Sequence, residues 1–358
     1  MSQSTYIIAE VGVNHNGSFE MAKKLVRVAK KAGADAVKFQ TFKAENLVTR
    51  GAKQAAYQIE NLGEATSQFD MLKKLELSYE EFTALKQYCD ELQIEFLSTP
   101  FDFESVDFLV GTLGMETVKI PSGELTNAPF IHYIAAKQKK IILSTGMATI
   151  DEIHESLAFI AYGLAGEKEV VLKDVQEFYE TSEAKNLLKQ YLTVLHCTTE
   201  YPAPFETINL KAMNQLKDEL QVPVGYSDHS EGITVPVAAT SLGAVVIEKH
   251  FTLDKTLPGP DHLASLNPDE LIAMVKGIRQ VELALGDGVK QPSAIELKNR
   301  NAARKSIVAK KAIAQGTLIT VEHLTLKRPG DGLSPSTYWS LIGTVAKKAY
   351  EKDDLIER

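Results

Sequence analysis

The sequence predicts an α/β protein: a (β/α)8 TIM barrel followed by a small C-terminal domain. Between Tyr6 and Lys249, eight short and nearly continuous apolar runs alternate with longer amphipathic segments. That alternation is typical of parallel strands buried on both faces. After Gly286-Asp287-Gly288 the chain becomes polar and then changes to short strand-like pieces. An open, doubly wound sheet is the alternative, and it is disfavoured because no GxGxxG string follows the first apolar run.

The expected strands are short and apolar, and the segments between them carry helical periodicity. The strands are predicted at residues 6–11, 36–40, 95–98, 117–120, 141–144, 193–196, 224–227 and 244–249. Amphipathic helices are expected at 19–31, 79–92 and 151–162, with Asp151 as a helix cap. Two polar, helix-prone excursions, 44–74 and 165–190, are interpreted as insertions between barrel elements.

The domain boundaries follow from the change in composition near residue 288. We assign residues 1–288 to the barrel, 289–304 to a polar linker and 305–358 to the small domain. Strand-like pieces at 306–309 and 317–319 and a turn at Pro329-Gly330 are expected in the small domain. Such a domain has only a marginal core, so it is expected to pack on the barrel or on a second subunit.

Composition excludes several classes of protein. The 358 residues carry a net charge of −8 without a basic block, which argues against nucleic acid as a partner. No signal peptide and no membrane-spanning run is visible, because the apolar stretch at 233–247 is short and interrupted. Cys89 and Cys197 are the two cysteines and form no CxxC pair. They are expected to be reduced thiols in a cytoplasmic protein.

Polar residues gather where the predicted strands end. In a (β/α)8 barrel these ends converge on one mouth, where the catalytic groups lie. Any one of these residues alone could be a solvated or capping side chain, but polar residues at all eight ends favour a site. They are Glu10, Lys38, Gln40, Thr99, Lys119, Ser122, Glu124, Ser144, Thr145, His196, Ser227, Asp228, His229, Glu248, Lys249 and His250.

His229 and His250 follow the seventh and eighth predicted strands, so they are expected to be neighbours. Two imidazoles offer nitrogen ligands for Mn²⁺, Fe²⁺, Zn²⁺ or similar ions, and Glu10 or Asp261 could complete or support the site. A lone histidine is more often a half-buried structural residue. The matched placement of the two favours a metal site.

Lys38 and Lys119 are expected to bring two ammonium groups into the same pocket. Buried cations need anions, which indicates a phosphate or carboxylate ligand. A Schiff-base lysine, as in aldolases of this fold, is the competing interpretation. Arg328 precedes the Pro-Gly turn, where an arginine is ordinarily a surface residue.

Ten strings in order make the chain resemble the sialic acid synthase family, also called N-acetylneuraminate synthases. The resemblance runs from residue 6 to about residue 355. The strings are AEVGVNHNG, VKFQTFKA, FLSTPFD, KIPSGE, ILSTGMATIDEI, LHCTTEYP, GYSDHS, IEKHFTLDK, GPDHLAS and KRPGDG. The resemblance implies a TIM barrel, a C-terminal antifreeze-like (SAF, β-clip) domain and a domain-swapped homodimer. It also implies condensation of phosphoenolpyruvate with N-acetylmannosamine to give N-acetylneuraminate and phosphate.

The resemblance also assigns roles to individual residues. It implies that His229 and His250 bind a divalent metal, Mn²⁺ with Mg²⁺ or Co²⁺ as alternatives. Phosphoenolpyruvate would contact Lys38, Thr99, Lys119, Ser122, Ser144 and Ser227. The sugar would contact Glu10, Gln40, Tyr201, Asp261 and, from the other subunit, Arg328. For proton transfer near the aldehyde we predict Glu10, with Glu124 as the second choice.

The acceptor sugar has two candidates. Some members of the family have an asparagine where this chain has Thr198-Thr199 in LHCTTEYPAPF. That string, with FLSTPFDFESVDFL and INLKAM, is also similar to legionaminic acid synthases, which use a 2,4-diacetamido-2,4,6-trideoxymannose. Two other classes of function stay open from the residues alone, a Schiff-base aldolase and a non-catalytic carbohydrate-binding protein.

Overall fold

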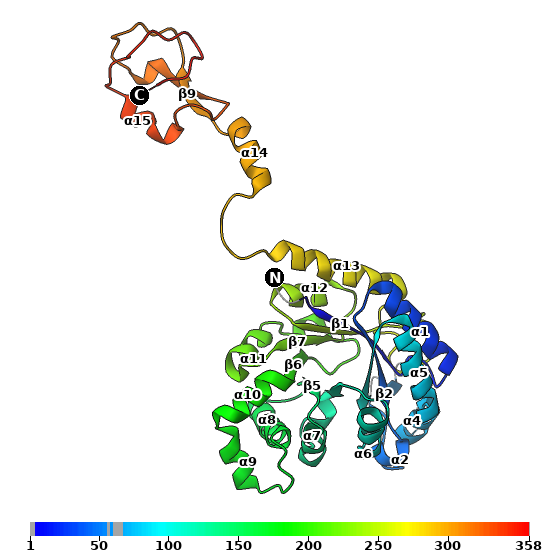
Figure 1. Cartoon of the computed structure of the whole chain (residues 1–358). Coiled ribbons are helices and arrows are strands. Elements are labelled where there is room, and N and C mark those ends of the chain that lie inside the picture. The colour runs from blue at the N-terminus through cyan, green and yellow to red at the C-terminus, as the bar shows by residue number, and fades with distance from the viewer. Residues whose placement is uncertain (1–3, 56–57, 60–66, 358) are drawn as a thin grey trace. The chain divides into compact units, whose positions relative to one another are not determined.

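The computed structural model describes residues 4–55, 58–59 and 67–357. The chain divides into two compact units, Met1–Gly286 and Asp287–Arg358 (Figure 1). Each unit has a hydrophobic core of its own. The segment predicted as a linker contains a helix, α14 (Ala294–Ala303), which begins at a capping box formed by Ser293 and Glu296.

Eight parallel strands form the sheet of the first unit, in the order β3-β2-β1-β8-β7-β6-β5-β4. The first strand in the chain, β1, pairs with the last strand of the unit, β8, as well as with β2, so the sheet curves toward closure. No ladder joins β3 to β4 in the part of the chain that the structure describes, so the barrel is nearly closed. The predicted TIM barrel is confirmed. Its strands are β1 (Tyr6–Gly12), β2 (Ala36–Thr41), β3 (Glu95–Pro100), β4 (Thr117–Ile120), β5 (Lys140–Ser144), β6 (Leu192–Cys197), β7 (Val224–Asp228) and β8 (Val246–His250).

Helical segments follow every strand and surround the barrel, as the (β/α)8 fold requires (Figure 1). A π-helical segment, Asp107–Thr112, continues α6, and 3₁₀ turns occur at Ser122–Glu124 and Phe205–Thr207. The α-helices whose bounds fall within the described residues of this unit are α1 (Phe19–Ala32), α2 (Ala44–Leu47), α4 (Gln68–Leu75), α5 (Tyr79–Leu92), α6 (Phe103–Val106), α7 (Ala128–Ala135), α8 (Ile150–Leu164), α9 (Leu172–Tyr179), α10 (Ser182–Tyr191), α11 (Ala212–Leu220), α12 (Thr234–Ser241) and α13 (Pro268–Leu285).

Most predicted ends of strands and helices differ from the observed ones by one or two residues, and two of these predictions need a physical correction. Asp151 is not the cap of α8, because Thr149 accepts a hydrogen bond from the backbone N–H of Glu152 and receives the reciprocal bond of a capping box. The last strand begins at Val246 instead of residue 244. Ala244 lies in the turn that closes the preceding helix, because its N–H donates to the carbonyl of Ala239.

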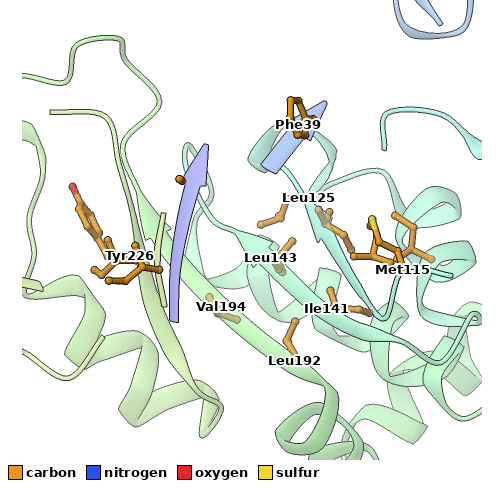
Figure 2. Close-up of a cluster of buried hydrophobic side chains, with 14 of the residues drawn as sticks. Phe39, Met115, Leu125, Ile141, Leu143, Leu192, Val194 and Tyr226 are labelled. Carbon is orange, nitrogen blue, oxygen red and sulfur yellow. The ribbon is translucent and has the colours of Figure 1, made fainter. Parts of the chain in front are cut away.

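The hydrophobic core has an outer layer between the strands and the helices. On β5 and β6, Ile141, Leu143, Leu192 and Val194 are buried in this layer (Figure 2). Because side chains of a strand alternate between its two faces, the intervening residues point into the barrel. The apolar faces of the helices therefore pack on the outer face of the strands, and the inner face of the same strands is buried inside the barrel.

The inside of the barrel has an apolar lower layer, below the carboxyl ends of the strands. Its residues come from six of the strands and are Ile8, Ala36, Leu97, Ile142, Leu195 and Val246. Gly225 of β7 makes room for this layer. A Cβ at Gly225 would lie 2.5 Å from the carbonyl oxygen of Val246 and 2.6 Å from Cδ2 of Leu195.

Gly225→Ala is therefore expected to destabilise the barrel by about 1–3 kcal/mol, because the packed interior must shift to admit a methyl group. Urea unfolding followed by circular dichroism measures this change. Gly111→Ala is the matched control, since a Cβ there meets no atom within 4 Å. Equal stabilities of the two variants would contradict the packing argument.

The two predicted insertions contain short helices. The first insertion includes α2 and α4. Met71 and Leu75 of α4 pack with Val13 and Phe42 in a small separate core. Residues 56–57 and 60–66 of this insertion lie outside the described residues. The second insertion forms α9 and α10, which pack against α8.

The second unit is a small β-rich body. β9 (Ser306–Ala309) matches a predicted strand and pairs antiparallel with β10 (Leu324–Lys327), which was not predicted. The strand predicted at 317–319 is wrong, because this segment makes one isolated bridge, Leu318 to Val345. The unit also contains α15 (Tyr338–Leu341) and 3₁₀ turns at Val321–His323 and Pro335–Thr337. Its core includes Ile307, Ile313, Ile319, Leu324 and Tyr350.

Among the described residues, no helix combines the length and the apolar character needed to cross a membrane. Cys89 and Cys197 are free thiols, as the sequence predicts, and the structure shows that both are buried.

Candidate active site

A polar cavity lies at the carboxyl ends of the barrel strands, and every strand contributes to it. It contains all the predicted site residues of the first unit except Glu124 and Asp261. Its lining residues are Glu10, Lys38, Gln40, Thr99, Phe101, Lys119, Pro121, Ser122, Ser144, Cys197, Tyr201, Ser227, His229, Glu248 and His250. The convergence expected from the positions of these residues at the strand ends is therefore present.

Strand alternation selects which polar residues face the cavity. On β8, Glu248 and His250 line it, whereas Lys249 between them does not. The same rule separates Cys197 of β6 from His196, which faces away and bonds the carbonyl of Ile208 through Nε2 at 2.7 Å. The charged residues thus form a layer directly above the apolar interior of the barrel.

Two lysines and two carboxylates form a buried network in this layer. The Nζ of Lys38 lies 2.7 Å from Oε2 of Glu10 and 3.6 Å from Oε2 of Glu248. Lys119 Nζ lies 3.3 Å from Oε1 of Glu248, and the same oxygen accepts a hydrogen bond from Ser227 at 2.9 Å. All four charged residues are buried. Their charges balance, so a further anion would be held mainly by reorganising these lysines toward it.

The two carboxylates differ in their tendency to hold a proton. Desolvation by burial raises the pKa of Glu10 to about 7, although Lys38 opposes the shift. Burial also acts to raise the pKa of Glu248, but the charges of Lys119 and Lys38 outweigh it and hold that pKa below its usual value. Carboxylates whose pKa values are pushed apart in one cavity are typical of acid–base sites. Glu10 can therefore exchange a proton near neutral pH, while Glu248 stays ionised.

Glu248 is absent from the predicted set of site residues, although it is one of the polar residues at the strand ends. A usable signal was present, because Glu248 lies two residues before His250 on the same strand and so shares its face. Its function as partner of both lysines depends on contacts between β8, β2 and β4, and sequence spacing does not reveal those contacts.

The two histidines face each other across β7 and β8, with ring centroids 5.6 Å apart. Nδ1 of His229 donates to the carbonyl oxygen of Thr198 at 2.6 Å, which leaves Nε2 without a proton and able to bind a cation. Tyr201 lies against the pair, with its ring centroid 4.1 Å from that of His229. Burial lowers the pKa of His229 to about 4, so this imidazole is neutral at pH 7.

This arrangement fits a divalent metal that keeps open coordination positions. Nδ1 of His250 is buried and has no hydrogen-bond partner among the described residues. Gly12 permits the close approach of this ring, since a Cβ there would lie 3.3 Å from Nδ1. The described residues form no group of three or more His, Cys, Asp or Glu ligands, so water or substrate oxygens would complete the coordination.

Three predicted site residues lie outside the cavity lining. The Glu124 carboxylate accepts a hydrogen bond from Asn127 at 2.7 Å in the turn after β4, so the geometry does not support it as the proton-transfer residue. Asp261 is buried in the segment after β8, and desolvation raises its pKa to about 6. Arg328 follows β10 in the second unit, where it is exposed.

Residues 25–290 match the sequence model of the NeuB family, and residues 304–357 match that of the SAF domain. The chain belongs to the NeuB family. The expected family resemblance and the expected SAF domain are therefore confirmed.

Comparison with named relatives indicates the kind of reaction that members of this family catalyse. The chain is 49% identical over 355 residues to the N,N'-diacetyllegionaminic acid synthase of Campylobacter jejuni, covering 99% of each chain. It is 47% identical to the enzyme of that name from Legionella pneumophila, covering 96% of this chain and 90% of the relative. Among solved structures, the N-acetylneuraminic acid synthetase of Leptospira borgpetersenii is similar with a TM-score of 0.66 at 30% identity, covering 84% of this chain and 92% of that one. This member of the NeuB family is thus an enzyme, a transferase of the sialic-acid-synthase type.

Proposed function

We propose that this enzyme condenses phosphoenolpyruvate with the open-chain aldehyde of an N-acylated mannosamine-type sugar. The observation that carries the proposal is the single cavity that joins Lys38, Lys119, Glu10 and the His229–His250 pair. Paired lysines suit the phosphate and carboxylate of phosphoenolpyruvate, and paired imidazoles suit a divalent ion, Mn²⁺ with Mg²⁺ or Co²⁺ as alternatives.

The residues of the cavity account for each part of the reaction. Lys38 and Lys119, with Thr99, Ser122, Ser144 and Ser227 around them, hold the anionic groups of phosphoenolpyruvate. His229 and His250 would hold a divalent ion, which would supply Lewis-acid polarisation of the sugar aldehyde. The enol carbon then attacks the aldehyde carbon, and Glu10 in its protonated form donates its proton to the developing alkoxide oxygen, which becomes the new hydroxyl group.

Water completes the reaction at C2 of the former phosphoenolpyruvate. Attack of the enol carbon leaves positive charge at C2, and water adds there and gives one proton to the Glu10 carboxylate, which restores its protonated form. As the C–O bond to phosphate breaks, the C2 hydroxyl of the tetrahedral intermediate loses its proton to the departing phosphate, and the keto group of the product remains. The cavity holds both reactants in place throughout, and such positioning and charge stabilisation account for much of the rate.

For the acceptor we propose the 2,4-diacetamido-2,4,6-trideoxymannose, with N-acetylmannosamine as the other candidate. The first expectation from the sequence was N-acetylmannosamine. The identities of 49% and 47% to legionaminic acid synthases, against 30% to an N-acetylneuraminic acid synthetase, support the diacetamido sugar instead. The string that contains Thr199 also resembles those synthases, and the Thr199 hydroxyl lies 3.4 Å from that of Ser122, which lines the cavity.

We also propose that the working form is a domain-swapped homodimer in which Arg328 reaches the partner's sugar. The second unit exposes several large apolar side chains, and exposed apolar surface favours contact with another surface. They are Leu318, Val321, Trp339 and Val345, with exposed fractions of 56%, 54%, 78% and 55%. Arg328 itself is exposed in this unit, which leaves its guanidinium accessible to a hydroxylated ligand.

A phosphate-release assay tests the proposed function. The enzyme is incubated with phosphoenolpyruvate, Mn²⁺ and either acceptor sugar, and inorganic phosphate is measured over time. We expect release only when a sugar and a divalent ion are both present, with a higher kcat/KM for the diacetamido sugar. A higher kcat/KM for N-acetylmannosamine would reverse the order of the two acceptors.

The competing aldolase chemistry is separated by borohydride trapping with pyruvate. A synthase that uses Lys38 and Lys119 as anion-binding groups is expected to give no reduced covalent adduct by mass spectrometry. An adduct on either lysine, or a complete absence of phosphate release with both sugars, would refute the synthase mechanism.

A further inference from the structure

A separate buried ion pair lies behind the cavity, at the ends of β7 and β8. Asp228 and Lys249 are cross-strand partners in the β7–β8 ladder, and each immediately precedes one of the two histidines. Nζ of Lys249 lies 2.6 Å from Oδ2 of Asp228, and both side chains are 0% exposed. Strand alternation turns this pair away from the cavity while the histidines line it.

The pair is bonded to the backbone on the far side of His229. Oδ1 of Asp228 accepts hydrogen bonds from the backbone N–H of Ser230 at 3.1 Å and from its hydroxyl at 2.8 Å. Lys249 also donates to the carbonyl oxygen of Ser230. Residues 228 and 230 are therefore both anchored, and His229 lies between the two anchors.

Further bonds make this cluster rigid. The hydroxyl of Tyr226 donates to Oδ1 of Asp228 at 3.1 Å, and His229 donates to the carbonyl of Thr198. A buried polar network whose members are all bonded holds one arrangement, whereas a partly bonded one is costly. The loop that carries His229 is thus tied to β8, the strand that carries His250.

Stability alone does not explain a buried ion pair at this place. Removing two charges from water costs about as much as their attraction returns, and apolar replacements of similar volume are often neutral or stabilising. The pair does, however, join the two strands at the residues next to His229 and His250. The pair therefore contributes mainly to the relative positions of His229 and His250.

We propose that Asp228 and Lys249 are positioning residues that hold His229 and His250 at the separation required to bind a divalent cation. The inference rests on the metal site of the proposed function. Residues that hold metal ligands in place without touching the metal still affect the affinity of the site for the ion, and their loss typically weakens metal binding by about 10- to 100-fold.

Calorimetric titration of Mn²⁺ into the metal-stripped enzyme tests the proposal without an activity assay. The double variant Asp228→Asn/Lys249→Met removes both charges with little change in volume, so no single charge is left buried. We expect its dissociation constant for Mn²⁺ to rise about 10- to 100-fold while its melting temperature stays close to that of the wild type. The control Asp107→Asn/Lys137→Met removes an exposed ion pair of 2.6 Å between the π-helical segment and the turn after α7, and it is expected to leave the dissociation constant unchanged.

A milder variant keeps the test decisive if the double variant does not fold. Ser230→Ala removes only the hydroxyl bond to Asp228, and we expect a smaller rise in the dissociation constant. A folded double variant, or a folded Ser230→Ala enzyme, that binds Mn²⁺ as tightly as the wild type would overturn the positioning role. If the wild-type enzyme itself binds no Mn²⁺, the metal site of the proposed function fails first, which is a different result in the same experiment.

Discussion

Replacing His229 by alanine is expected to lower kcat/KM by roughly 10³-fold and to abolish tight binding of Mn²⁺. The loss follows because a Lewis acid on the aldehyde supplies several kcal/mol of transition-state stabilisation, and each 1.36 kcal/mol is tenfold in rate. His250→Ala is expected to behave in the same way, since the two imidazoles act as one binding unit. Phosphate release gives the rate, and calorimetry gives the affinity for the ion.

His196→Ala is the matched control for these variants. His196 also lies near the end of a barrel strand, but it faces outward and bonds the carbonyl of Ile208. We expect this variant to lose some stability and to keep its affinity for Mn²⁺. Wild-type activity in fully metal-stripped enzyme, or wild-type affinity in His229→Ala, would rule out the two-histidine site.

Mixing two inactive variants is expected to restore activity. Arg328→Ala and His229→Ala are each expected to be nearly inactive with the sugar, because one lacks the arginine and the other lacks a metal ligand. If each site combines the barrel of one subunit with Arg328 of the other, a heterodimer contains one intact site. Random reassortment of equal amounts then restores about a quarter of the wild-type sites. Activity after mixing and dilution measures this recovery.

Lys327→Ala is the control for the arginine. Lys327 is its neighbour in sequence but forms an ion pair with Asp353 inside its own unit. We expect this variant to keep full sugar use, and we expect Arg328→Ala to raise the KM for the sugar while the KM for phosphoenolpyruvate changes little. A mixture of the two inactive variants that recovers no activity would refute a site shared between subunits.

Much of the barrel could be predicted because its signals are local. Each strand is a short apolar run, and β4 begins and ends where the sequence predicts. The helix at Tyr79–Leu92 is also predicted correctly, since Ser78 and Glu81 form a capping box. In the small domain, β10 and the segment at 317–319 were misjudged because short strands there depend on partners far along the chain.

The sequence predicted which polar residues lie at the strand ends better than it predicted which of them face the cavity. Polar residues at strand ends are visible in the sequence, but the face that each occupies depends on the register of the sheet. His196 and His229 have similar sequence settings, yet only His229 lines the cavity. Glu124 follows its strand closely but bonds Asn127 instead of facing the cavity.

Local patterns of residues were enough to predict the order of the elements, the barrel and the residue types that converge at its mouth. Only the folded chain shows that Glu248 is paired with Lys119, that burial raises the pKa of Glu10 to about 7, and that Asp228 pairs with Lys249. These properties depend on burial and on distances between strands far apart in the chain. Electrostatic energy varies steeply with both quantities, and neither is encoded in any local pattern of residues.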